Sequence, residues 1–176
     1  METGIRLVEY NPDWPQQFEQ GRSCIFVACE GLVTAVEHIG STAVPGLAAR
    51  PVIDMIGIVR QASDLDEALA LLKGIGYIDL QRRGDAVSSY QLLCTPRYDS
   101  VQYRLYLALE DSPQWKRQLT IRDWLRRHPQ GAQRYVTLKQ HLALRYGDNS
   151  QSYEQAKTLF LLHLEEQAEA ELEGGA

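Results

Sequence analysis

The chain has 176 residues, of which 44% are hydrophobic, enough for one domain, or one domain with an appendage, to bury a core. No run reaches the roughly 18 to 20 apolar residues of a membrane span, and the N-terminus lacks the apolar stretch of a secretory signal. We therefore expect a cytoplasmic protein with no membrane partner. The formal net charge of −5 argues against a nucleic-acid partner, because such proteins are usually basic overall.

The charge is unevenly distributed along the chain. Residues 97–146 carry ten Lys or Arg against four Asp or Glu, whereas the remainder carries eight against nineteen. A basic segment in an acidic protein favours a site for a small anionic molecule. A solvated helix face is the alternative interpretation.

The cysteines and histidines show no spacing typical of a metal site. Cys24 and Cys29 lie in the apolar run SCIFVAC, which predicts small core residues, and Cys94 stands alone. The four histidines form no H-E-x-x-H or similar pattern. We therefore expect no zinc site.

The first third of the chain carries one helix signal and two strand signals. Residues 11–29 offer Asp13 as a helix cap and Pro15 in the first turn, which predicts a helix. The run GLVTAVEHIG, residues 31–40, predicts a strand. The run PVIDMIGIV, residues 51–59, predicts a strand that is apolar on both faces and therefore central in its sheet.

A second helix and three more strands are expected before residue 110. The helix is predicted over residues 63–77, with Ser63 as its cap and Gly74 or Gly76 as its stop. The strand candidates are residues 77–83, 88–94 and 101–109. In the last of them, apolar residues alternate with others, so that one face is apolar.

After Glu110 the pattern becomes helical. Three helices are expected, at residues 111–128, 129–147 and 150–171, the first with Asp111 or Ser112 as its cap. The sequence thus predicts an α+β fold with a mixed β-sheet and flanking helices in residues 1–110, and a helical segment in residues 111–176 packed on this core.

A carboxylate stands inside the apolar run PVIDMIGIV. An ionised aspartate costs several kcal/mol there unless it is paired or bound to a cation. Just before this strand, Gly40 lets another group approach the backbone closely, and Ser41 and Thr42 offer hydroxyl and N–H groups that could cradle a phosphate. A divalent cation could then bridge the phosphate and Asp54.

Two interpretations of Asp54 stay open at this stage. In the structural one, Asp54 pairs with Arg50 or His38 beside a tight turn. In the functional one, it lines an open ligand or cation site to which Glu37 could add a second carboxylate. Glu37 and His38 face opposite sides of their strand, so only one of them can reach such a site.

Basic and aromatic residues recur four positions apart in the helical part, and such pairs share a helix face. The pairs are Arg122 with Arg126, Tyr135 with Lys139, and Tyr153 with Lys157. Arginine pairs suit bidentate binding of phosphate or carboxylate, and a tyrosine can stack on a base. Taken singly, each of these residues is more typical of an exposed charge or an aromatic at the rim of a core.

The run VEHIGSTAVPGLAARPVIDMIGIV, residues 36–59, resembles the signature of the GrpB family, HIGSTAVPGL-A-[KR]-P-[IV]-ID. The resemblance continues through IRLVEYNPDWPQQFE, LLKGIGY, LTIRDWLRRHPQGAQRYVTLKQHLA and SYEQAKTLF, and spans roughly residues 5 to 165. It implies a fold similar to the polymerase-β-type nucleotidyltransferases. In some bacteria the domain is fused to dephospho-coenzyme A kinase.

The superfamily pattern implied by this resemblance is Gly-Ser, about ten residues, two carboxylates, and a third carboxylate on a later strand. Gly40 and Ser41 match the phosphate-binding pair, and Asp54 matches the first metal carboxylate. The second carboxylate position holds Ile56, a departure that counts against two-metal transfer chemistry. A further departure lies in YRLYLAL, where family members often have H-L-H.

Asp54 is accordingly the candidate catalytic residue, and Asp54 and Glu37 are the candidate metal ligands, with Mg²⁺ as the possible cofactor. The candidate ligand-binding residues are Gly40, Ser41, Thr42, Arg50, Arg122, Arg126, Tyr135, Lys139 and Lys157. The favoured hypothesis is a module that binds a nucleotide or another phosphorylated anion. The alternatives are an active Mg²⁺-dependent nucleotidyl- or phosphoryltransferase and an accessory module of coenzyme A metabolism.

Overall fold

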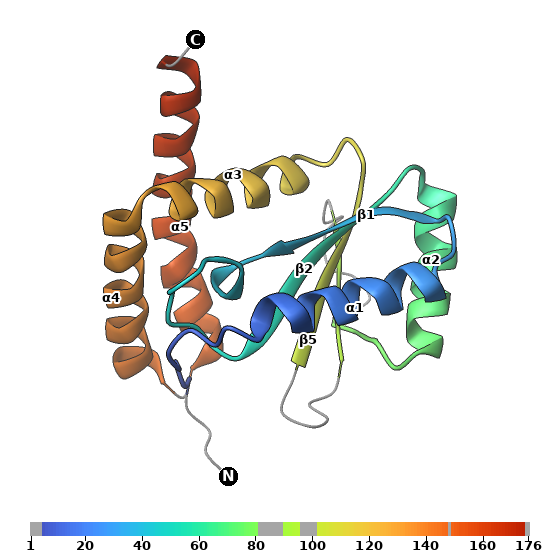
Figure 1. Ribbon diagram of the computed structural model, residues 1–176, viewed down its shortest axis with the longest axis horizontal. Helices are drawn as coiled ribbons and strands as arrows, with labels where there is room; N and C mark the ends of the chain where they lie inside the picture. The colour runs from blue at the N-terminus through green and yellow to red at the C-terminus, as the bar shows by residue number, and fades with distance from the viewer. Residues whose placement is uncertain (1–4, 81–89, 96–101, 148, 175–176) are drawn as a thin grey trace.

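The computed structural model describes residues 5–80, 90–95, 102–147 and 149–174 (Figure 1). Its elements are α1 (Trp14–Ala28), β1 (Val33–Ile39), the 3-10 turn η1 (Ser41–Ala43), β2 (Val52–Val59), α2 (Ala62–Gly74), β3 (Ile78–Asp79), β4 (Tyr90–Cys94), β5 (Gln102–Leu109), α3 (Pro113–Arg127), α4 (Pro129–Tyr146) and α5 (Ser150–Gly174). No helix in these described ranges is long and apolar enough to cross a membrane.

The strands form one mixed sheet in the order β1-β2-β5-β4-β3. The β1–β2, β5–β4 and β4–β3 pairs are antiparallel, whereas β2 and β5 run parallel. The apolar run PVIDMIGIV thus forms an inner strand, as its composition predicts. Residue pairing along the parallel β2–β5 contact places Asp54 directly beside Arg104.

One face of the sheet carries the main core. Ile53 and Met55 of β2 and Leu105 and Leu107 of β5 are almost fully buried there against α1 and α2. Because successive strand residues point to opposite faces, Asp54 and Arg104 point to the other face. The alternation in residues 101–109 therefore predicts the apolar side of β5 correctly.

The C-terminal helices have their own hydrophobic cluster and form a separate group beside the sheet (Figure 1). Ile121, Trp124 and Leu125 of α3 pack there with α4 and α5. Val44 and Leu47, from the loop between β1 and β2, belong to the same cluster. This loop therefore joins the sheet to the helices. The domain boundary at residue 110 stays a prediction.

The helix ends follow their expected signals in part. Ser112 caps α3 by accepting a hydrogen bond from the backbone N–H of Gln114, and α2 ends at Gly74, with Gly76 in the left-handed region. The predicted Ser63 cap is wrong, because α2 begins at Ala62 and encloses Ser63. Asp13 precedes α1 but makes no side-chain cap. The strand predictions for residues 81–83, 88–89 and 101 lie outside the described residues.

Candidate ligand-binding site

A cavity of about 340 Å³ lies between the second face of the sheet and the C-terminal helices. Six basic side chains line it, against two carboxylates, those of Asp54 and Glu154. The basic residues are Arg50, Arg104, Arg117, Arg122, Lys139 and Lys157. Such an excess of positive charge in a recess raises the local concentration of anions.

The turn at Gly40 brings the backbone against Asp54. Gly40 has φ +70° and ψ −167°, a combination that is essentially restricted to glycine. A Cβ at this position would lie 2.8 Å from Asp54 Oδ2. The glycine is therefore required both by the backbone conformation and by the space that the carboxyl occupies.

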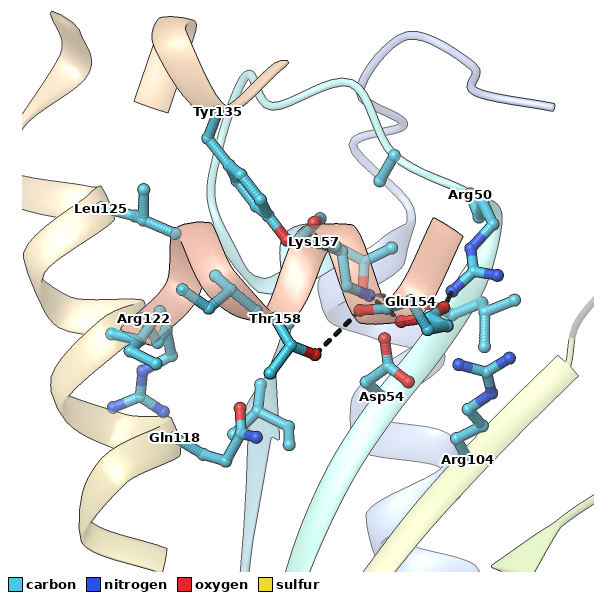
Figure 2. A pocket seen from close by; sticks show the side chains of 18 of the residues that line it. Arg50, Asp54, Arg104, Gln118, Arg122, Leu125, Tyr135, Glu154, Lys157 and Thr158 are labelled. Carbon is cyan, nitrogen blue, oxygen red and sulfur yellow. Dashed lines mark hydrogen bonds and ion pairs between the residues drawn. The ribbon is translucent and has the colours of Figure 1, made fainter. Parts of the chain in front are cut away.

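Asp54 is partly accessible through the cavity, while its Oδ1 atom is enclosed and has no hydrogen-bond partner among the described residues. Burial raises the pKa of this carboxyl, and the positive charges of Arg104, Lys157 and Arg50 act in the opposite direction. Figure 2 shows the Asp54 carboxyl and the Arg104 guanidinium extending from neighbouring strands into the same part of the cavity. Neither structural partner considered for Asp54 is paired with it, because Arg50 and His38 bind elsewhere.

Glu154 of α5 holds two of these cations. Its Oε1 accepts from Arg50 Nη2 at 2.5 Å, and its Oε2 accepts from Lys157 Nζ at 2.5 Å. Both cations also lie over the Tyr153 ring, 5.5 and 5.7 Å from its centroid. Burial would raise the pKa of Glu154, but Lys157 and Arg50 together keep it below its usual range. Glu154 is therefore ionised, and each of its carboxylate oxygens is paired with a cation, Arg50 or Lys157.

Lys139 and Ser41 meet at the turn. Lys139 is almost fully buried, and its Nζ donates to Ser41 Oγ at 3.0 Å and to the Ala48 carbonyl at 2.6 Å. Burial, reinforced by Lys157 and Arg50, lowers the pKa of Lys139 to about 7. The structure thus brings the predicted residues Ser41, Lys139 and Tyr135 together, since Lys139 Nζ also lies 4.8 Å from the centroid of the Tyr135 ring.

The predicted Arg122 and Arg126 pair is divided by the structure. Arg122 lines the cavity, and its Nη1 donates to Glu37 Oε2 at 2.7 Å and to the His38 carbonyl at 3.1 Å. Arg126 donates from Nε to the Ala43 carbonyl and lies along a separate, open groove on α3. The two residues therefore do not face one anion together, although they share a helix.

Thr42 and His38 are engaged in the fold around the turn. The Thr42 hydroxyl donates to the Val52 carbonyl at 3.2 Å, so the 2.9 Å contact with His38 requires His38 Nε2 to donate. Burial, together with Arg126 and Arg122, lowers the pKa of His38 to about 4, in keeping with a neutral ring stacked on Phe18. The Thr42 side chain is thus committed to the fold.

The fold class implies Mg²⁺, but the donors around Asp54 fit a two-ion centre poorly. Of Glu37 and His38, the structure places Glu37 on the Asp54 face of the sheet, opposite Ile56, yet Glu37 is paired with Arg122. Glu154 is bound to two cations, and Ile56 is fully buried. Among the described residues, no three His, Cys, Asp or Glu side chains are grouped so that they could hold a metal ion.

Sequence reasoning did not assign several residues of this cavity. They are Tyr90, Arg104, Tyr106, Gln114, Arg117, Gln118 and Glu154. The alternation in residues 101–109 places Arg104 and Tyr106 on the face of the strand opposite the core, and this pattern could have identified them as candidates. Glu154 follows Tyr153 and precedes Lys157 by three positions, a spacing that brings charges together on one helix face.

The fold is nucleotidyltransferase-like. The crystal structure of the Cid1 poly(U) polymerase with MgGTP bound superposes with a TM-score of 0.52 at 11% identity, over 78% of this chain and 44% of Cid1. At that identity the likeness concerns the fold alone. The crystal structure of the conserved protein GrpB from Enterococcus faecalis is more similar, with a TM-score of 0.81 and 32% identity over 93% of this chain and 96% of that one.

The chain belongs to the GrpB family, whose model, described as GrpB protein, matches residues 4–167. It is 29% identical to the UPF0157 protein YqkA of Bacillus subtilis over 93% of this chain, and 31% identical to the UPF0157 protein PA4798 of Pseudomonas aeruginosa over 87%. It spans 47% and 63% of the lengths of these two relatives. A dephospho-CoA kinase of Mycobacterium bovis is 28% identical over 76% of this chain and 38% of the kinase.

Proposed function

We propose that the cavity binds a nucleotide or another phosphorylated small molecule. The observation that carries the proposal is the excess of six basic side chains over two carboxylates in one recess. Ser41 and Lys139 at the turn, with Arg50 and Lys157 opposite, form the end that suits phosphate groups. Charge-assisted hydrogen bonds to phosphate are about twice as strong as neutral ones.

Binding without transfer is favoured over a transferase reaction. Two-metal transfer requires several carboxylates around ions about 3.5 to 4 Å apart. Here Asp54 is next to a buried Ile56 on its own strand and beside Arg104 on the next. The transferase hypothesis therefore lacks its ligands in the described part of the cavity.

The test is ligand-dependent stabilisation of the purified protein. ATP, ADP, dephospho-coenzyme A and inorganic phosphate are compared by thermal unfolding and titration calorimetry, with dephospho-coenzyme A included because a relative is a dephospho-CoA kinase. A ligand at a hundred times its dissociation constant stabilises the fold by about 2.7 kcal/mol. For a chain of this size that raises the Tm by about 5 to 10 °C.

A matched pair of variants assigns the effect to the cavity. Lys157→Ala removes a cation that lines the recess and should weaken the stabilisation, whereas Lys116→Ala removes an exposed cation elsewhere and should not. If none of the four ligands shifts the wild-type transition, the proposed function fails. Release of phosphate or pyrophosphate from ATP would instead show transfer or hydrolysis.

A further inference from the structure

The immediate neighbours of Asp54 on its face of the sheet are unsuited to a metal ion. Its partner on β1 is Ile39, which is 1% exposed, and the next residue on the same face of β2 is Ile56, which is 0% exposed. Its partner on β5 is Arg104. Mg²⁺ requires near-octahedral oxygen ligands, and these three neighbours offer two aliphatic side chains and a guanidinium.

Arg104 already supplies a positive charge at this place. Among its neighbours, Arg104 has the largest favourable electrostatic effect on the Asp54 carboxylate, ahead of Lys157 and Arg50. Burial would lower the pKa of Arg104, but Asp54, Tyr106 and Glu154 together raise it, so the guanidinium stays charged. A guanidinium has five N–H donors, and Asp54 Oδ1 accepts none of them, so Arg104 retains donors for an anion in the cavity.

We propose that the cavity binds its phosphorylated ligand without a divalent cation, with Arg104 providing beside Asp54 the positive charge that a metal ion would otherwise bring. The inference rests on the proposed function and concerns how the same site holds the ligand. Asp54 lies beside Arg104 on the neighbouring strand, and both side chains extend into the same part of the cavity (Figure 2).

The two modes of binding give opposite expectations for divalent ions. If a metal bridged Asp54 and the phosphates, EDTA would abolish binding. In the metal-free mode, Mg²⁺ reduces the negative charge of ATP and so weakens its attraction to the basic side chains. Binding of ATP in EDTA should then be at least as tight as in excess Mg²⁺.

The decisive experiment is titration calorimetry of the wild-type protein with ATP at fixed ionic strength, in EDTA and in excess Mg²⁺. We expect equal or tighter binding in EDTA. Tighter binding in Mg²⁺ overturns the inference while leaving the proposed function intact. If ATP binds in neither condition, the same titrations are repeated with ADP, dephospho-coenzyme A and inorganic phosphate. The proposed function fails only if none of the four ligands binds, and the inference fails if a ligand that binds does so more tightly in Mg²⁺.

Variants at the two neighbouring positions separate the modes further. Arg104→Ala should weaken ATP binding in EDTA at least tenfold, while Arg134→Ala, which removes an exposed arginine outside the cavity, should leave it unchanged. Asp54→Asn should retain binding in EDTA, because it removes a negative charge from an anion site. Wild-type affinity in Arg104→Ala, or loss of binding in a folded Asp54→Asn protein, contradicts the inference. If Arg104→Ala does not fold, the wild-type comparison in EDTA and Mg²⁺ decides.

Discussion

Replacing Lys139 by methionine removes a buried ammonium group while nearly keeping its length. The folded-state pKa of Lys139 is lowered from 10.5 to about 7, chiefly by burial. Below pH 7 the lysine is protonated in both the folded and the unfolded protein, and the cost of burying the charge is fully present. Between about 7 and 10.5 the unfolded state binds more protons, so this residue adds stability as the pH rises.

The magnitude follows from the linkage relation. A difference of one pH unit inside this window is worth about 1.4 kcal/mol. From pH 7 to 9 the wild-type protein should therefore gain roughly 2 kcal/mol in free energy of unfolding relative to Lys139→Met. Because the pKa is lowered, this gain on raising the pH is positive. Lys139→Met also leaves Ser41 and the Ala48 carbonyl without their donor, which changes the free energy of unfolding by an amount that does not depend on pH.

The assay is urea unfolding of both proteins at pH 6, 7, 8 and 9. Lys116→Met serves as the control, since Lys116 is exposed on α3 and its replacement should give a difference that does not change with pH. If the difference between wild type and Lys139→Met stays constant within about 0.5 kcal/mol, Lys139 does not titrate in this range. A pKa of about 7 for Lys139 is then wrong.

Three further substitutions test the turn and its surroundings. Gly40→Ala should destabilise the fold by about 2 kcal/mol or more, because of its backbone conformation and the contact with Asp54; chemical unfolding measures this, and a neutral substitution would contradict the geometry. Arg122→Ala should remove the thermal protection given by ATP, whereas Arg126→Ala should keep it; equal effects would refute the assignment of Arg122 alone to the cavity. Asp54→Asn should leave the free energy of unfolding at pH 7 unchanged or slightly raised, since burial raises the pKa of Asp54. A loss above about 3 kcal/mol in urea unfolding would instead identify Asp54 as half of a structural ion pair.

The parts of the fold that depend on local pattern were predictable. The strands predicted at residues 31–40 and 51–59 are confirmed as β1 and β2, and the structure pairs them in the sheet. The helices expected after Glu110 are present as α3 (Pro113–Arg127), α4 (Pro129–Tyr146) and α5 (Ser150–Gly174). The nucleotidyltransferase-like fold was reached through the GrpB resemblance, and both are confirmed.

The electrostatic surroundings of Asp54 could not be predicted in the same way. Alternation indicates that Arg104 leaves the core face, but only the parallel pairing of β2 with β5, fifty positions apart in the chain, places it beside Asp54. The i, i+4 spacing correctly places Arg122 and Arg126 on one side of α3. Sharing a helix face does not place both residues in the cavity, and only Arg122 lines it. In the structure Arg122 contacts the end of β1, whereas Arg126 contacts the loop between β1 and β2.

The two hydrophobic clusters have a consequence for how the protein opens. The sheet with α1 and α2 forms one hydrophobic cluster and the C-terminal helices form another, to which Val44 and Leu47 of the loop between β1 and β2 belong. The cavity lies on the junction, with walls from both groups of elements. Sub-global opening between them should therefore be the lowest-energy route to backbone amide exchange in α3 to α5. A ligand that contacts both walls would close that route, and exchange in these helices would slow while exchange in the strand core stays unchanged.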